Sequence, residues 1–116
     1  MTSVLIVDDH PSFRASARAI LEAEGFDVIG EADDAASALE AAEVLAPDVV
    51  LLDVQLPDGT GFEVCERLCK NDRRPRIVLV STRDASDYDD LIEASRARGF
   101  ITKADLSGEA LRELIG

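Results

Sequence analysis

Polar residues follow four short apolar segments of the chain, and several of them are acidic residues of the kind that bind metal ions. Asp8 and Asp9 end the first segment, Asp53 ends another, and Ser81 and Lys103 end two more. Carboxylate oxygens are the hard ligands that Mg²⁺ prefers. Two carboxylates about 4 Å apart repel by roughly 4 kcal/mol at an effective dielectric constant of 20, so three gathered acids need a compensating cation. These residues therefore predict a magnesium site, provided that the fold brings them together.

Five short segments have the length and composition of β-strands. The central ones, such as residues 49–52, are runs of consecutive aliphatic residues, which is typical of parallel strands covered by helices on both faces. The predicted strands cover residues 3–8, 26–31, 48–53, 76–81 and 99–102.

Stretches with apolar residues at helical spacing separate these strands. Pro11 suits the first turn of a helix, Asp34 suits an N-cap, and Gly25 and Pro47 suit helix ends. The acidic residues within 84–90 are interpreted as the solvated start of the fourth helix, and the glycines at 59 and 61 as a loop. The predicted helices run through residues 11–24, 35–45, 64–69, 91–94 and 106–115.

The alternation of five strands with five helices predicts an α/β fold with a doubly wound parallel sheet. No linker or repeat divides the chain, so residues 1–116 are expected to form one domain. Ligands of such sheets bind beyond the carboxyl ends of the strands. The five polar residues of the predicted magnesium site lie at that edge.

The charge of the chain excludes several classes of function. Its 12 Lys and Arg residues face 24 Asp and Glu residues, which gives a net charge of −12. Such acidity disfavours direct binding to nucleic acid or to an anionic membrane surface. The longest apolar runs are too short to span a bilayer, and acidic residues interrupt any signal peptide by Asp8, so a cytoplasmic protein is expected.

The cysteines and the single histidine offer little further chemistry. Cys65 and Cys69 are one helical turn apart and are interpreted as two half-buried structural thiols. Zinc would need more soft ligands than these and His10 provide, and no serine lies in a G-x-S-x-G context. We expect His10 to be a polar loop residue that precedes Pro11.

Taken in order, these motifs resemble the receiver domain of two-component response regulators. The resemblance covers essentially the whole chain, and Ser81 lies 28 residues after Asp53 and 22 before Lys103, as in the family. It implies a single flavodoxin-like (βα)5 doubly wound domain with a five-stranded parallel sheet in the order 2-1-3-4-5. It is closest to the subfamily that usually carries a C-terminal helix-turn-helix module. The motifs are Val-Asp-Asp-His-Pro at 7–11, Val-Val-Leu-Leu-Asp at 49–53, Leu-Pro-Asp-Gly-Thr-Gly at 56–61, Ser81, and Phe-Ile-Thr-Lys at 100–103.

The resemblance assigns a role to each site residue. Asp53 would be the phosphoacceptor that attacks a phosphohistidine of a partner kinase, and Lys103 and Ser81 would contact the phosphoryl oxygens. Such a transfer needs an in-line nucleophile and cations rather than a proton relay. The implied Mg²⁺ ligands are Asp9 and Asp53 directly, Asp8 through a bound water, and the main-chain carbonyl of Gln55.

The resemblance also implies a switch rather than a turnover enzyme. Ser81 would move toward the phosphoryl group and Phe100 would turn inward, which changes the surface of the fourth helix, fifth strand and fifth helix. The implied partners are a sensor histidine kinase or phosphotransfer protein, met by the face around the first helix, and a second copy on phosphorylation. Contact with DNA would come only from a helix-turn-helix module outside these residues.

Three other readings of the same residues are open. The chain could be an interaction module that keeps the fold without phosphorylation. A magnesium-dependent phosphohydrolase of the haloacid-dehalogenase type would place a second acid two residues after its nucleophile, where this chain has Gln55. A flavodoxin-like electron carrier would share the architecture, but aromatic residues are sparse here.

Overall fold

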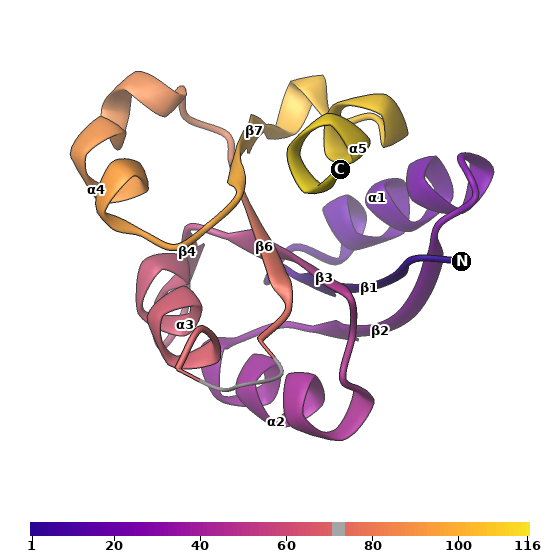
Figure 1. Cartoon of the computed structure of the whole chain (residues 1–116), viewed down its shortest axis with the longest axis horizontal. Coiled ribbons are helices and arrows are strands. Elements are labelled where there is room, and N and C mark those ends of the chain that lie inside the picture. The colour runs from indigo at the N-terminus through magenta and orange to yellow at the C-terminus, as the bar shows by residue number, and fades with distance from the viewer. Residues whose placement is uncertain (71–73) are drawn as a thin grey trace.

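The centre of the molecule is a sheet of five parallel strands in the order β2-β1-β3-β6-β7 (Figure 1). This order is the predicted 2-1-3-4-5 once the sheet strands alone are counted, and the flavodoxin-like α/β class is confirmed. The computed structural model describes residues 1–70 and 74–116. The strands of the sheet are β1 (Ser3–Val7), β2 (Asp27–Ala32), β3 (Val49–Asp53), β6 (Arg76–Ser81) and β7 (Gly99–Thr102).

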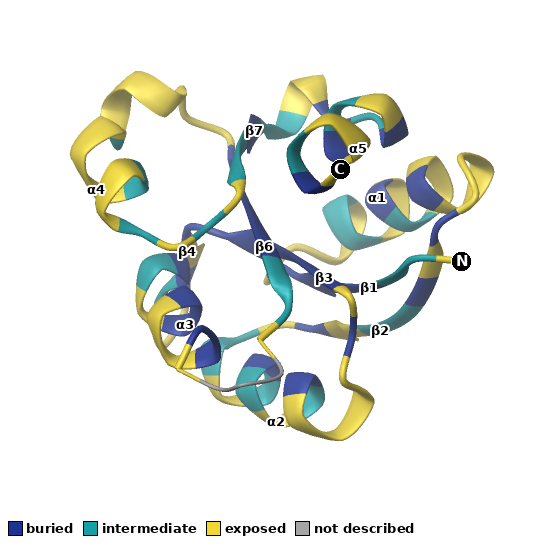
Figure 2. Ribbon diagram, in the orientation of Figure 1, coloured by how far each residue is buried: buried dark blue, intermediate teal, exposed yellow. Residues whose placement is uncertain are grey.

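Helices cover both faces of the sheet, as Figure 1 shows. The helices α1 (Pro11–Ala23) and α5 (Gly108–Ile115) pack on one face, and α2 (Ala35–Leu45) and α3 (Gly61–Leu68) pack on the other. Successive strand residues point to opposite faces, so each strand supplies both cores. In Figure 2 the central strands β1, β3 and β6 are therefore almost entirely buried, the edge strands β2 and β7 are only partly buried, and the outer helix faces are exposed.

The predicted helix signals act largely as expected at α1 and α2. Pro11 begins α1, and Gly25 follows its end with φ of +89°, a conformation that costs glycine little. The Asp34 side chain caps α2 by accepting a hydrogen bond from the Ser37 main-chain N–H at 2.7 Å. These local signals therefore set the lengths of both crossover connections.

The region after β3 differs from the prediction. Instead of a plain loop, β4 (Gln55–Leu56) and β5 (Gly59–Thr60) form a short antiparallel hairpin. Thr60 then caps α3 in a reciprocal arrangement with Glu63, and Gly61 is the first helical residue. The Thr-x-x-Glu pattern is a helix-start signal that the glycines on either side of Thr60 obscured.

Two further expectations are corrected. The last helix begins at Gly108 rather than at residue 106, because the Ser107 side chain caps it by accepting a hydrogen bond from the Ala110 N–H at 3.0 Å. The cysteines are buried rather than half-buried. Burial, followed by the neighbouring Cys69, raises the pKa of the Cys65 thiol to about 12, so it stays protonated and unreactive.

The fourth helix is the least embedded of the α-helices in the described part of the chain. α4 (Asp89–Ala94) contains no buried residue, and Asp89 and Asp90 occupy its first turn as the acidic segment predicts. A short 3₁₀ turn (Ala85–Asp87) precedes it. Elements with few buried contacts open at low free-energy cost, so α4 is the part of the fold most easily displaced.

None of the helices in residues 1–70 and 74–116 has the length and apolar character needed to cross a membrane.

The start of α3 depends on the absence of a side chain at Gly61. Its N–H donates to the Val54 carbonyl at 2.7 Å, and a Cβ at Gly61 would collide with the main-chain carbonyl oxygen of Asp53. We expect Gly61→Ala to lower the free energy of unfolding by about 2 kcal/mol or more, measured by equilibrium urea denaturation. The control is Gly59→Ala, whose Cβ would meet Glu63 Oε1 at an ordinary 3.6 Å. Equal losses for the two variants would contradict this prediction.

Candidate phosphoryl and metal site

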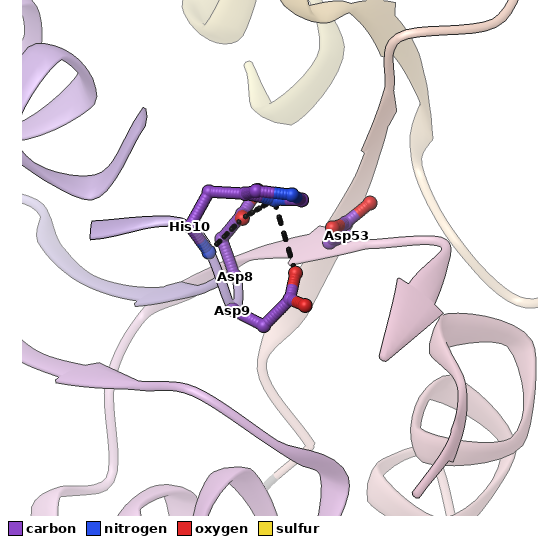
Figure 3. A group of neighbouring side chains, drawn as sticks. All are labelled: Asp8, Asp9, His10 and Asp53. Carbon is purple, nitrogen blue, oxygen red and sulfur yellow. Dashed lines mark hydrogen bonds and ion pairs between the residues drawn. The ribbon is translucent and has the colours of Figure 1, made fainter. Parts of the chain in front are cut away.

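The neighbouring strands β1 and β3 bring the predicted acids together at the carboxyl edge of the sheet. Val7 pairs with Leu52, so the residues that follow each strand emerge side by side. One ligand atom from each of Asp8, Asp9, His10 and Asp53 lies within 4.8 Å of the others (Figure 3). Asp8 and Asp53 are buried, whereas Asp9 remains exposed to solvent. The expected convergence of acids from separate segments is therefore observed.

Lys103 supplies the nearest positive charge to the two buried acids. Its Nζ lies 2.5 Å from Asp8 Oδ2 and 3.4 Å from Asp53 Oδ2. The ammonium group also lies 4.5 Å from the centroid of the Phe13 ring, which shields it from water. One cation thus faces two carboxylates, and the local charge remains negative.

The main chain and α1 hold Asp8 in place. Asp8 Oδ1 accepts a hydrogen bond from the His10 main-chain N–H at 2.8 Å, and the Asp8 carbonyl accepts one from Arg14 Nη1 at 2.6 Å. Asp8 Oδ2 is buried and accepts no hydrogen bond of ordinary geometry among the described residues, although Lys103 lies close to it. Such an oxygen suits a further cation or a metal-bound water.

The surroundings of Asp53 make its ionised form unfavourable. Desolvation by burial first, and then the negative charge of Asp8, raise the pKa of Asp53 from 3.8 to about 6, against the opposing effect of Lys103. The hydrogen bond from the Gln55 main-chain N–H to Asp53 Oδ1 is long, at 3.4 Å. Asp53 is therefore a buried carboxyl group whose ionised form would be stabilised by any added positive charge.

The other predicted residues lie around the same edge at different depths. Ser81 is buried at the end of β6, and its hydroxyl accepts a hydrogen bond from the Arg83 N–H at 3.1 Å rather than contacting Asp53. Gln55 is exposed in β4, two residues beyond Asp53. Phe100 is half-buried in β7 and packs against the core on the α2 and α3 side of the sheet.

Sequence reasoning missed the position of His10. Its ring Nδ1 lies 3.0 Å from Asp8 Oδ1 and 3.0 Å from Asp9 Oδ1, so the expected plain loop residue belongs to the acidic cluster (Figure 3). The available signal in the sequence was that His10 directly follows the two acids. The turn before Pro11 brings the His10 ring back onto the carboxylates of that pair.

Tyr88 was also missed. Its ring lies 5.8 Å from that of Phe62 and 6.1 Å from that of Phe100, measured between centroids, and links α3, the start of α4 and β7. Its hydroxyl is buried and has no hydrogen-bond partner among the residues that the structure describes. The chain's single tyrosine, set in an acidic segment, was the only signal in the sequence.

The chemistry of the donor set fits Mg²⁺. Asp8, Asp9 and Asp53 offer carboxylate oxygens at one edge; the buried Oδ2 of Asp8 has Lys103 as its close neighbour, and the exposed Asp9 leaves a side that admits water. Hard oxygen donors with room for several waters are what this ion requires. The cluster is therefore compatible with a divalent cation.

Comparison with known proteins assigns the chain to a family. The sequence model of the response regulator receiver domain matches residues 4–115, and this chain belongs to that family. The resemblance inferred from the motifs is thus confirmed.

Several relatives are named as regulators, and solved neighbours share the fold. The chain is 33% identical over 116 residues to the response regulator GacA of Pseudomonas aeruginosa, covering 99% of this chain and 52% of that protein. It is 37% identical over 100 residues to BvgA of Bordetella pertussis, covering 86% of this chain and 48% of that protein. A LuxR-family two-component response regulator from Aurantimonas sp. SI85-9A1 superimposes with a TM-score of 0.88 at 28% identity, covering 99% of this chain and 86% of that one. This chain spans about half the length of these curated relatives.

Ionisation of Asp53 should lower stability in the absence of metal. In the unfolded chain its carboxyl group loses its proton near pH 4, but in the folded chain it does so near pH 6, so its contribution to stability falls as pH rises between these values. A shift of about two units corresponds to about 3 kcal/mol as an upper bound. We expect Asp53→Asn to raise the free energy of unfolding by about 1–3 kcal/mol at pH 7.5 with EDTA, and to change it little at pH 4.

The measurement is urea denaturation at both pH values. Asp90→Asn, at an exposed position in the first turn of α4, is the matched control and should show no such pH-dependent gain. A wild type that is as stable as Asp53→Asn at pH 7.5 would show that Lys103 fully compensates the buried charge.

Proposed function

We propose that this domain is a magnesium-dependent phosphoacceptor in two-component signalling, with residues 1–116 acting as one unit. The observation that carries the proposal is the juxtaposition of Asp53 with Asp8, Asp9 and Lys103 at the carboxyl edge of the sheet. A histidine kinase or phosphotransfer protein would supply the phosphoryl group as phosphohistidine. Membership of the receiver family supports this role.

In the proposed reaction, an oxygen of Asp53 attacks the phosphorus atom and the phosphorus–nitrogen bond to histidine breaks. The product is an aspartyl phosphate and a free imidazole on the partner. Lys103, which already contacts Asp53, would pair with a phosphoryl oxygen, and Ser81 would donate its hydroxyl hydrogen bond to another. Their task is to position and neutralise charge, which is most of what phosphoryl transfer requires.

The metal would be held by the carboxylates of Asp9 and Asp53, by Asp8 through a water, and by the main-chain carbonyl of Gln55. Bound Mg²⁺ would supply electrophilic stabilisation of the charge on the phosphoryl oxygens. The two buried carboxylates of Asp8 and Asp53 favour binding of the cation, because the single positive charge of Lys103 does not neutralise both of them. His10 would be displaced from Asp9 when that carboxylate binds the ion.

The proposed output is a change in the surface formed by α4, β7 and α5. Phosphorylation adds about −1.5 to −2 of charge at Asp53, which would draw Ser81 toward it. Phe100 would then turn inward. Its ring centroid lies 6.1 Å from that of Tyr88, so this rotation would displace Tyr88 and with it the start of α4. The shallow burial of α4 supports its role as the movable element.

The wider protein is proposed from its relatives. GacA is named as a response regulator, and the Escherichia coli relative EvgA, 31% identical over 103 residues, is named as a DNA-binding transcriptional activator. Because the chain matches about half of each, we propose that a DNA-binding module accompanies this domain, that phosphorylation favours pairing of two copies, and that the protein acts in the cytoplasm. The domain itself would switch rather than turn over substrates.

The phosphoacceptor role can be tested by intact-mass analysis. With acetyl phosphate and Mg²⁺, the wild type should gain one phosphoryl group, whereas Asp53→Ala should gain none because it lacks the nucleophile. Lys103→Ala should lower the labelled fraction at least tenfold, since it removes a contact to the phosphoryl oxygen. Asp90→Asn serves as the control and should label like the wild type. Equal labelling of wild type and Asp53→Ala would place the acceptor elsewhere.

Magnesium should stabilise the native protein. At ten times the dissociation constant, a ligand that binds only the folded state adds about 1.4 kcal/mol, which raises Tm by about 6 °C for a chain of this size. Asp53→Ala should weaken this response because it removes a ligand, and Asp90→Asn should keep it. Differential scanning calorimetry with MgCl₂ or EDTA measures the effect, and an unchanged wild-type Tm would count against the metal site.

A further inference from the structure

A basic pocket lies away from the phosphoryl site. Its volume is about 490 Å³, and four of its lining residues are arginines, although the chain carries only 12 Lys and Arg residues and a net charge of −12. The lining residues of this arginine pocket are Cys69, Arg74, Pro75, Arg76, Arg96 and Arg98.

The arginine pocket lies at the amino edge of the sheet. Arg76 is the first residue of β6, and Arg98 directly precedes β7 and donates its main-chain N–H to the Ile77 carbonyl at 2.7 Å. The phosphoryl site lies at the carboxyl ends of the same strands, where Ser81 ends β6. Six strand residues span about 17 Å, so the two sites are separate.

The pocket arginines differ in their surroundings from the arginines of α1 and α5 that form ion pairs. Arg14 and Arg18 both pair with Glu31, and Arg112 pairs with Glu24. Among residues 1–70 and 74–116, no carboxylate lies within 4 Å of the guanidinium groups of the pocket. Within the described residues, no ion pair therefore engages these four guanidinium groups.

Two contacts hold Arg76 at the back of the pocket. Its Nη1 donates to the Ile115 carbonyl at 3.0 Å, and its main-chain N–H donates to the Asp48 carbonyl at 3.0 Å. The Asp48 carboxylate accepts a hydrogen bond at Oδ2 from the Ser3 N–H at 2.9 Å; this hydrogen bond and, less strongly, the positive charge of Arg76 hold its pKa below the usual range. Arg76 is thus preorganised, with donors left for a ligand.

We propose that the arginine pocket binds a compact phosphate-bearing anion of the di- or triphosphate type. Guanidinium groups match phosphate oxygens in paired hydrogen bonds, and several charges converging on one hollow suit a ligand with several charges. Duplex nucleic acid and anionic membranes would need an extended basic surface, whereas the acidic remainder of this chain repels them. The shared chemistry of inorganic triphosphate and nucleoside triphosphates therefore defines the ligand class.

Isothermal titration with inorganic triphosphate tests this proposal. The titration uses the whole chain in EDTA at about 50 mM salt, so that electrostatic attraction is only partly screened. We expect saturable 1:1 binding to the wild type and at least tenfold weaker binding to the double variant Arg96→Gln/Arg98→Gln. Arg18→Gln/Arg112→Gln removes the same charge from two ion-paired positions that do not line the pocket, and should bind like the wild type.

Further arms separate the sources of binding. ATP that binds more tightly than triphosphate would identify a nucleotide ligand, and equal affinities would identify the phosphate chain alone; both support the pocket. Side-chain Nε–H NMR signals of the four pocket arginines should shift on titration. Asp53→Asn should leave binding unchanged, so failure of the phosphoacceptor role would not affect this result.

Three results would overturn the proposal. The first is no saturable binding of triphosphate by the wild type. The second is an equally large loss of triphosphate affinity in both double variants. The third is tight binding of a DNA duplex by the wild type without detectable binding of triphosphate. Circular dichroism of each variant checks its folding, and Arg96→Lys/Arg98→Lys, which keeps the charge, should recover part of the affinity if the pocket is the site.

Discussion

Repulsion between the buried carboxylates of Asp8 and Asp53 is the constraint around which this fold is organised. The two groups share a single ammonium, Lys103, at 2.5 and 3.4 Å, and therefore retain an excess of negative charge. Burial and Asp8 together raise the pKa of Asp53 to about 6, so at neutral pH the ionised carboxylate lowers the stability of the fold. A site in this condition favours whatever supplies positive charge.

Rigid packing makes that arrangement possible. The acids sit directly after β1 and β3, whose register and two hydrophobic cores fix the main chain to which the carboxylates are attached. The close approach of Gly61 to Asp53 then fixes the turn beyond β3. By contrast, α4 has no buried residue and contacts the rest through Tyr88 and its neighbours. The fold thus combines a rigid carboxyl edge with one loosely attached helix.

The sequence predicted what depends on local chemistry and on strand ends. Aliphatic runs located β1, β3 and β6, shorter apolar segments indicated β2 and β7, and the residues that end the strands located the acidic site. Other features arise from contacts between distant residues or from competing local signals. The hairpin around Gly59 was hidden because glycines suggest a loop and a helix cap equally well. The contacts of His10 depend on a turn, and those of Tyr88 on the distance between α3 and β7, neither of which leaves a periodic pattern.

The two edges of the sheet carry opposite charge, and the segment between β6 and β7 that includes α4 runs from one edge to the other. Arg96 and Arg98 lie between α4 and β7, the elements proposed to change when Asp53 is phosphorylated. Any displacement of α4 would therefore alter the spacing of half of the arginines of the pocket. Thermodynamic linkage is reciprocal, so a ligand that prefers one arrangement of Arg96 would bias the phosphoryl site by the same free energy. Coupling through β6 is weaker, because its residues are buried and their positions fixed on both faces. The loosely held segment, rather than the rigid sheet, is consequently the route by which the two edges would communicate.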